Sequence, residues 1–120
     1  MKVAITAQGK SMDAQVDTRF GRAKYFIVID TESGEIQVFD NKQNLSAAQG
    51  AGIQAARNVA SVGVDGVITG HVGPKAFAVL NTAGIKIYTG VEKTVEDTLR
   101  QFKDGNLTCL DNADVEGHWV

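Results

Sequence analysis

The chain has 120 residues, the length of one typical domain, and we expect residues 1–120 to form a single domain. Hydrophobic residues make up 43% and charged residues 22%, a composition that indicates a soluble globular protein and not a disordered one. The net charge of −2 argues against a general nucleic-acid binder. No apolar run approaches the roughly 18 residues of a membrane span. Residues 1–5 have no signal-peptide layout, so we expect a cytoplasmic protein without nucleic-acid or membrane partners.

Cys109 is the single cysteine, and it limits the metal chemistry open to the chain. One thiol forms no internal disulfide, and it cannot supply the four thiolates of a usual iron–sulfur cluster. Zinc sites built from Cys and His are equally disfavoured, because the only histidines are His71 and His118. A metal group bound by this chain must therefore bring most of its own ligands.

The first forty residues predict three strands. Lys2–Ala7 is a short β-branched run, typical of a buried central strand. Tyr25–Asp30 is apolar almost throughout and predicts a strand covered on both faces. Residues 35–40 return after a turn at 31–34, which is too short for a crossover, so these two strands are predicted to form an antiparallel hairpin.

The connection over residues 8–24 is long for a compact domain, and such connections are usually functional or mobile. Its cations outnumber its carboxylates, with Lys10, Arg19, Arg22 and Lys24 against Asp13 and Asp17. We call residues 19–24 the basic loop. Its charge favours an anion site, and the alternative is a solvated loop that Phe20 anchors.

The rest of the chain predicts alternating helices and strands. Ser46 and Gln49 have capping-box spacing, with a helix start near Gly52 as the alternative and Gly63 as the end. Strands are predicted at 66–69 and 85–88. Between them, a helix over 73–83 is predicted to bury Phe77, Leu80, Ala76 and Ala83. A last helix is predicted to begin after its N-cap Thr94 and to end at Gly105, with Val95, Leu99 and Phe102 as its apolar stripe. Residues 107–110 are a candidate for a short added strand, and His118 and Trp119 are read as tail residues.

This order of elements resembles the ribonuclease-H-like α/β architecture, a three-layer fold. The right-handed crossover rule predicts a mixed five-stranded sheet of order 3-2-1-4-5, with strand 2 antiparallel. The loops after strands 1, 3, 4 and 5 then leave at one edge. A crevice opens between strands 1 and 4, where the strand order reverses.

Residues 70–75, Gly-His-Val-Gly-Pro-Lys, follow the fourth strand and open a helix; we call them the glycine loop. Pro74 is favoured in a first helical turn. The N–H groups of that turn, the helix dipole and the Lys75 ammonium would favour an anion beside His71. The alternative is a sharp turn permitted by its glycines, with His71 uninvolved.

The basic loop, residues 50–52 and the glycine loop are predicted to converge on the crevice. The candidate cofactor-binding residues are Arg19, Phe20, Gly21, Arg22, Lys24, Gly50, Gly52, Gly70, His71, Val72, Gly73, Pro74 and Lys75. Catalysis is not expected: residues 3–6 lack the carboxylates of two-metal hydrolysis, and neither a nucleophile elbow nor a nucleotide P-loop is present. These residues predict a receptor for a bulky anion with an apolar side.

Two motifs, residues 17–23 (Asp-Thr-Arg-Phe-Gly-Arg-Ala) and residues 69–76 (Thr-Gly-His-Val-Gly-Pro-Lys-Ala), resemble the dinitrogenase iron–molybdenum cofactor biosynthesis family. The resemblance covers nearly the whole chain and is greatest to single-domain members from anaerobes. It implies a carrier or insertase of preformed metal–sulfur clusters, such as a molybdenum–copper sulfide cluster held without covalent attachment. It also implies that the basic loop and the glycine loop line the cluster site, and that P-loop ATPases of the cell-division class are partners.

Arg19 departs from the family pattern, in which an Asp-x-His-Phe-Gly motif often has histidine at this position. Arginine does not ligate metal at neutral pH but pairs well with an anionic sulfide shell. This favours a molybdenum–copper sulfide cluster over an iron–molybdenum type cluster. His71 is left as either a metal ligand or a hydrogen-bond donor. The alternative function, a small-anion or nucleotide-binding regulatory module, rests on the helix N-termini alone, and a hydrolase is a distant third.

Overall fold

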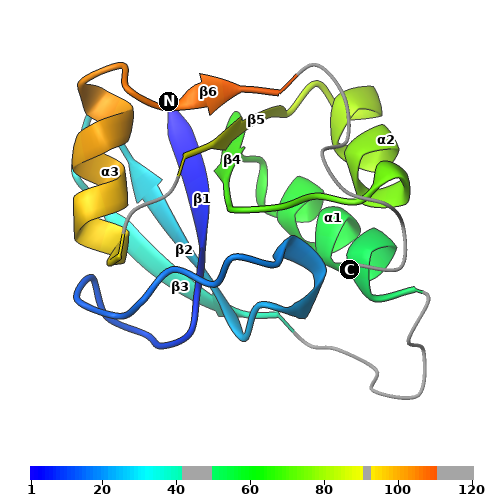
Figure 1. The fold of residues 1–120 in the computed structure, drawn as a ribbon, viewed down its shortest axis with the longest axis horizontal. Helices are drawn as coiled ribbons and strands as arrows, with labels where there is room; N and C mark the ends of the chain where they lie inside the picture. Colours follow the sequence, from blue (N-terminus) through cyan, green and yellow to red (C-terminus); the bar gives the residue numbers. More distant parts are fainter. Residues whose placement is uncertain (42–49, 91–92, 111–120) are drawn as a thin grey trace.

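The structure is a computed structural model that describes residues 1–41, 50–90 and 93–110. One six-stranded sheet has the order β3-β2-β1-β4-β5-β6. In chain order the elements are β1 (Lys2–Ala7), the 3₁₀ helix η1 (Phe20–Arg22), β2 (Tyr25–Asp30), β3 (Ile36–Asp40), α1 (Ala51–Val62), β4 (Gly66–Ile68), α2 (Pro74–Thr82), β5 (Lys86–Thr89), α3 (Val95–Lys103) and β6 (Thr108–Cys109) (Figure 1).

The strand directions confirm a mixed α/β sheet. β1 pairs antiparallel with β2 and parallel with β4, and β4 pairs parallel with β5. β3 returns antiparallel beside β2, as the short turn predicts. The predicted order 3-2-1-4-5 and the antiparallel strand 2 are therefore confirmed, while the ribonuclease-H-like assignment stays a prediction.

The predicted number of strands is wrong, because β6 adds a sixth at the edge of the sheet. Cys109 pairs with Tyr88 and Thr108 pairs with Thr89, both in antiparallel register. β6 lies inside residues 107–110, the candidate for a short added strand, although two exposed residues show no alternation of polar and apolar side chains. Pairing with β5 alone defines it.

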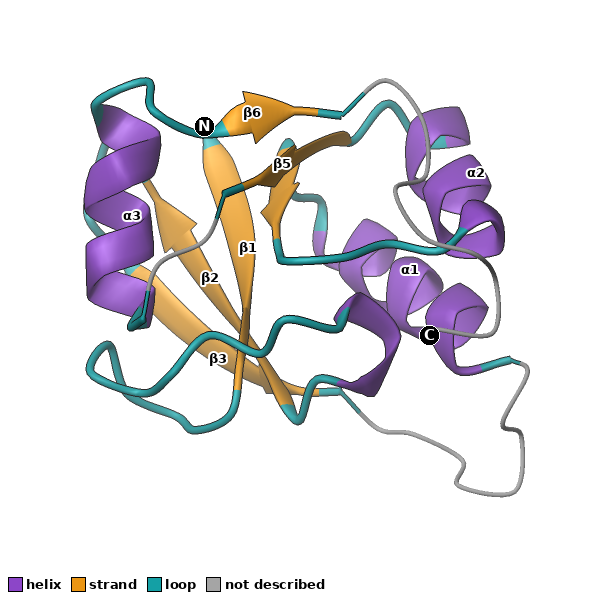
Figure 2. Cartoon of the chain, viewed as in Figure 1, coloured by secondary structure: helices purple, strands orange, loops and turns teal. Residues whose placement is uncertain are grey.

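Helices cover both faces of the sheet, which makes three layers. Alternate side chains of a strand point to opposite faces. Ala4, Val28 and Val67 accordingly join one buried cluster with residues of α1 and α2. Ile5 and Ile27 join a second cluster, against which α3 packs on the other face (Figure 2). β2 is thus covered on both faces, as its apolar sequence predicts.

The helix ends follow the local sequence where the structure describes them. Gly63 ends α1 in the left-handed region with φ 83°, as predicted. α1 begins at Ala51 with Gly50 as N-cap, and the predicted capping residues Ser46 and Gln49 lie outside the described residues, as do His118 and Trp119.

α2 buries a narrower face than its sequence predicts. Ala76 and Leu80 are fully buried, and Phe77 is partly buried. Ala83 is exposed, which corrects the prediction, and it is the C-cap of a helix that ends at Thr82. Among the described residues, no helix is long and apolar enough to cross a membrane.

Thr94 supplies the N-cap of α3, since its Oγ1 accepts a hydrogen bond from the N–H of Asp97 at 3.1 Å. Thr94→Ala is expected to lower the free energy of unfolding by about 1 kcal/mol, because that N–H loses its acceptor. Thr94→Ser, which keeps the hydroxyl, should retain most of the stability. Urea denaturation compares the three proteins, and equal midpoints for the alanine variant and the parent would contradict the assignment.

Candidate functional site

The long connection after β1 is held against the carboxyl edge of the sheet by backbone hydrogen bonds. The N–H of Gln8 donates to the C=O of Gln15 at 2.9 Å, so the connection folds back on itself. The N–H of Val16 donates to the C=O of Lys93 at 3.1 Å, close to the start of α3. The N–H of Asp17 then donates to the C=O of Thr6 at the end of β1, at 2.9 Å. The basic loop therefore starts from an anchored position.

Asp17 shapes the entry to the basic loop. Its side chain is 7% exposed, and its Oδ1 accepts a hydrogen bond from the N–H of Arg19 at 3.0 Å. This contact between a side chain and the backbone two residues on is an Asx turn, and it leads directly into η1. The Asp17 carboxylate is thus turned toward its own backbone, while the Arg19 side chain is exposed.

Phe20 is a core residue. Its side chain is 0% exposed and lies against Phe26 of β2, with ring centroids 5.7 Å apart. The prediction that Phe20 offers an apolar surface to a ligand is therefore wrong for this structure. The structure supports the alternative interpretation, in which Phe20 anchors the basic loop to the core.

The basic loop and the glycine loop are joined directly. The N–H of His71 donates to the C=O of Thr18 at 2.7 Å, and the N–H of Phe20 donates to the C=O of His71 at 3.1 Å. These two hydrogen bonds form a parallel bridge between Arg19 and His71. The side chains of these two residues, 52 positions apart, therefore start from neighbouring points of the backbone.

Gly70 is required by this close approach. A Cβ at Gly70 would lie 2.6 Å from the carbonyl oxygen of Thr18, closer than real Cβ contacts come. Its φ is not among the positive values, so a left-handed turn does not explain the residue. The reading of Gly70 as a residue that only permits a sharp turn is wrong.

The third predicted segment also meets the basic loop. A Cβ at Gly21 would lie 2.9 Å from both the Cα and the N of Gly52, so η1 rests against the first turn of α1 (Figure 2). The basic loop therefore contacts both other segments, as the predicted convergence requires. Whether any of these residues binds a ligand stays a prediction.

The candidates divide by exposure. Arg19, Lys24, Pro74 and Lys75 are exposed, Arg22, Gly50 and His71 are half-buried, and Phe20, Gly21, Gly52, Gly70, Val72 and Gly73 are buried. The side chain of Val72 belongs to the same buried cluster as Phe20, so it does not line a surface site. The C=O of Lys24 accepts from the N–H of Asn41 at 2.9 Å, which places Lys24 on the β2 side of the basic loop.

Three threonines near these loops are absent from the candidate residues, although Thr69 is the first residue of the second motif. Thr6, Thr69 and Thr89 stand at the carboxyl ends of β1, β4 and β5, and the hydroxyl of Thr89 donates to the C=O of Gly70 at 2.8 Å. One signal could have found them, namely the recurrence of a threonine near the end of the predicted strands 1, 4 and 5.

Side chains that could bind a metal ion are few and scattered in the part of the chain that the structure describes. It contains no group of three or more His, Cys, Asp or Glu residues that could hold a metal ion. Cys109 is exposed on β6. His71 is half-buried beside Arg19.

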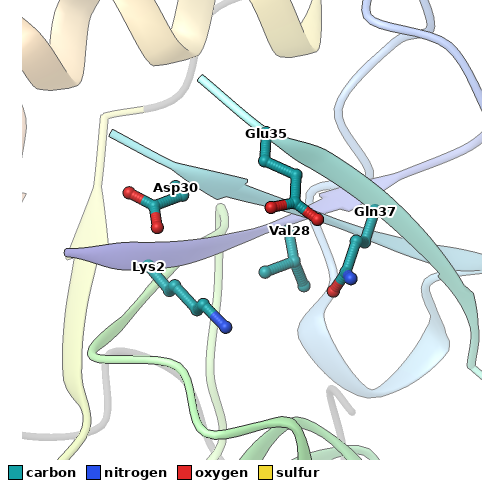
Figure 3. Close-up of a pocket in the computed structure, with 5 residues that line it drawn as sticks. All are labelled: Lys2, Val28, Asp30, Glu35 and Gln37. Carbon is teal, nitrogen blue, oxygen red and sulfur yellow. The ribbon is translucent and has the colours of Figure 1, made fainter. Parts of the chain in front are cut away.

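Hollows also lie elsewhere on the sheet. A groove of about 430 Å³ runs between α1 and the β2–β3 edge, with Phe39 and Asn58 among its lining residues. A shallower hollow lies at the Lys2 end of β1 (Figure 3), lined in part by Asp30. The N–H groups of Glu32 and Ser33 donate to the Asp30 carboxylate and hold its pKa below the ordinary value. These contacts order the β2–β3 turn.

The whole chain compares closely with one family. Residues 1–105 match the family model described as Dinitrogenase iron-molybdenum cofactor, and the chain belongs to that family. The predicted resemblance is thereby confirmed.

The chain is also similar to solved structures and to a curated relative. The apo form of the orange protein from Desulfovibrio gigas is 39% identical over 95% of this chain and 96% of that one, with a TM-score of 0.86. A Thermotoga protein provisionally called a NifB protein is 34% identical over 96% of this chain and 97% of its own, with a TM-score of 0.80. An uncharacterised protein of Methanocaldococcus jannaschii is 28% identical over 109 residues, 89% of each chain.

Gly70→Ala is expected to push the glycine loop away from Thr18 and to lower the free energy of unfolding by about 1–3 kcal/mol, as overpacking does. Gly84→Ala is the matched control, because Gly84 has φ 76° and open space around it. That control should cost on the order of 1 kcal/mol of backbone strain and leave the site unchanged. Urea denaturation and amide hydrogen exchange at His71 measure the two effects. Unchanged exchange in Gly70→Ala would contradict the close approach.

Proposed function

We propose that this chain binds and carries a preformed, anionic metal–sulfur cluster without catalysing a reaction on it. The observation that carries the proposal is the bridge between Arg19 and His71, which joins a cationic loop to a glycine-rich loop at one edge of the sheet. Membership of the dinitrogenase cofactor family and similarity to the orange protein support a metal-cluster carrier.

The charges of the site suit an anion. Arg19 and Lys75 are exposed, and Arg22 is half-buried. The neighbouring Asp17 carboxylate accepts the N–H of Arg19 and keeps its negative charge, but the three cations outnumber it. α2 begins at Pro74 directly beyond His71, and the positive end of its dipole adds to the same field. A negatively charged group at this edge is therefore stabilised by several sources at once.

A cluster that brings its own sulfide ligands fits these residues best. Arg19 pairs with anions but does not ligate metal. The described residues offer no three-ligand metal group, so a bare metal ion lacks a matching site there. We therefore favour a molybdenum–copper sulfide cluster over an iron–molybdenum type cluster. His71 serves this cluster as a metal ligand or as a hydrogen-bond donor to sulfide. X-ray absorption of the loaded protein, compared with His71→Asn, distinguishes the two.

The first experiment loads the anaerobically purified protein with tetrathiomolybdate and copper(I). Protein freed of excess reagent should retain molybdenum, copper and visible absorption. Protein that stays colourless and metal-free would overturn the molybdenum–copper assignment. Thermal shift tests the rival role, because stabilisation by phosphate or nucleotides but not by the cluster would favour a small-anion or nucleotide-binding regulatory module.

The double substitution Arg19→Ala with Lys75→Ala is expected to weaken cluster retention about tenfold at low salt, from roughly 0.5–1 kcal/mol for each exposed cation. The difference should shrink as salt rises, because salt screens exposed charges. Equilibrium dialysis with metal analysis measures retention.

The matched control is Lys86→Ala with Lys103→Ala. It removes the same charge from two exposed lysines, at the opposite end of β5 and at the end of α3. If both double variants retain the cluster equally, Arg19 and Lys75 do not belong to the site.

A further inference from the structure

Two fully buried threonines lie beneath the joined loops. Thr6 and Thr69 are each 0% exposed. β1 and β4 are parallel neighbours with Ile5 opposite Ile68, so the next residues on both strands, Thr6 and Thr69, are also side by side. Alternation along β1 places Thr6 on the same face as Ala4, the face on which Phe20 packs. The hydroxyls therefore lie under the basic loop.

The hydroxyls form a directed chain into that loop. The Oγ1 of Thr6 lies 2.6 Å from the carbonyl oxygen of Asp17 and 2.8 Å from the Oγ1 of Thr69. A carbonyl oxygen only accepts, and a hydroxyl has one hydrogen to give. Thr6 therefore donates to Asp17, and Thr69 donates to Thr6. The residue after β4 is thereby linked through β1 to Asp17, two residues before the basic loop.

This series of hydrogen bonds ends at the groups that set the position of Arg19. Asp17 receives the Thr6 hydroxyl on its C=O, and its carboxylate accepts the N–H of Arg19. On the other side, Thr69 immediately precedes Gly70, whose C=O accepts the Thr89 hydroxyl. The same network thus holds the backbone on both sides of the bridge between Arg19 and His71.

We propose that Thr6 and Thr69 are positioning residues that fix the spacing between Arg19 and His71 for cluster binding. The proposal rests on the function proposed above. Filling the core does not require these hydroxyls, because valine has the same shape. A buried hydroxyl is costly unless it is bonded, whereas a fully satisfied buried network specifies one arrangement of the groups it joins. Here those groups are the two loops of the site.

The test compares Thr6→Val and Thr69→Val with Thr6→Ser, which keeps the hydroxyl. Thr98→Val is the matched control, because Thr98 is equally buried but lies on α3, against the opposite face of the sheet. Retention of a cluster loaded from tetrathiomolybdate and copper(I) should fall about tenfold in either valine variant at the site, equivalent to ~1.4 kcal/mol. Thr6→Ser should restore most of it, and Thr98→Val should retain the cluster as the parent does.

A second measurement needs no cluster. The N–H groups of His71 and Phe20 cross between the loops. Their hydrogen exchange, followed by NMR in the unloaded protein, should be faster in Thr6→Val than in Thr98→Val. Circular dichroism shows that each variant is folded, and Thr69→Val replaces Thr6→Val if the latter does not fold.

The outcomes separate the two proposals. A parent protein that retains no cluster overturns the molybdenum–copper assignment of the proposed function, and the exchange rates then decide on positioning alone. Unchanged exchange at His71 and Phe20 in a folded Thr6→Val overturns the positioning role. Equal loss of cluster retention in Thr6→Val and Thr98→Val also overturns it, since a general loss of stability would then be sufficient.

Discussion

The site depends on one pair of backbone hydrogen bonds, from His71 to Thr18 and from Phe20 to His71. They exist because Gly70 lets the backbone come within a distance at which no Cβ fits. Residues far apart in the sequence thereby share one edge of the sheet. This contact places the backbone of Arg19 beside that of His71, four residues before the exposed Lys75.

The topology of the sheet makes that contact possible. β1 and β4 are parallel neighbours, so the connections that follow them leave at the same edge. The side chain of Phe20 packs in the core cluster with residues of α1 and α2 and so holds the basic loop in place. The N–H of Val16 donates to the C=O of Lys93, close to the start of α3, and so holds the preceding segment. A long connection that is anchored at both of these points does not need secondary structure of its own to hold a definite shape. Only the short helix η1 interrupts it among the described residues.

Much of this arrangement can be predicted from the sequence, and the remainder has identifiable physical reasons. Strand order and the convergence of the loops follow from apolar periodicity and the crossover rule, which are local or topological. The burial of Phe20 and Val72 depends on packing against distant strands, and no local pattern encodes it. The sequence predicts that Gly70 belongs to a special loop, but the requirement for glycine comes from the nearby Thr18 carbonyl, which leaves no space for a Cβ. The two-residue strand β6 is defined by its partner alone.

A carrier differs from a resident metal site in one respect: it must give its cargo up. Metal–protein bonds would have to be broken at each transfer, whereas the attraction between exposed cations and an anionic sulfide shell weakens as soon as solvent or a partner competes for the charge. A site of this kind needs little ligating chemistry but a well-defined geometry, since weak contacts are effective only when they are placed together beforehand. The backbone bridge at His71, the close approach at Gly70 and the bonded threonines beneath them supply such a geometry. The close backbone contacts at this edge and the exposure of Arg19 and Lys75 are therefore complementary features of the same proposed function.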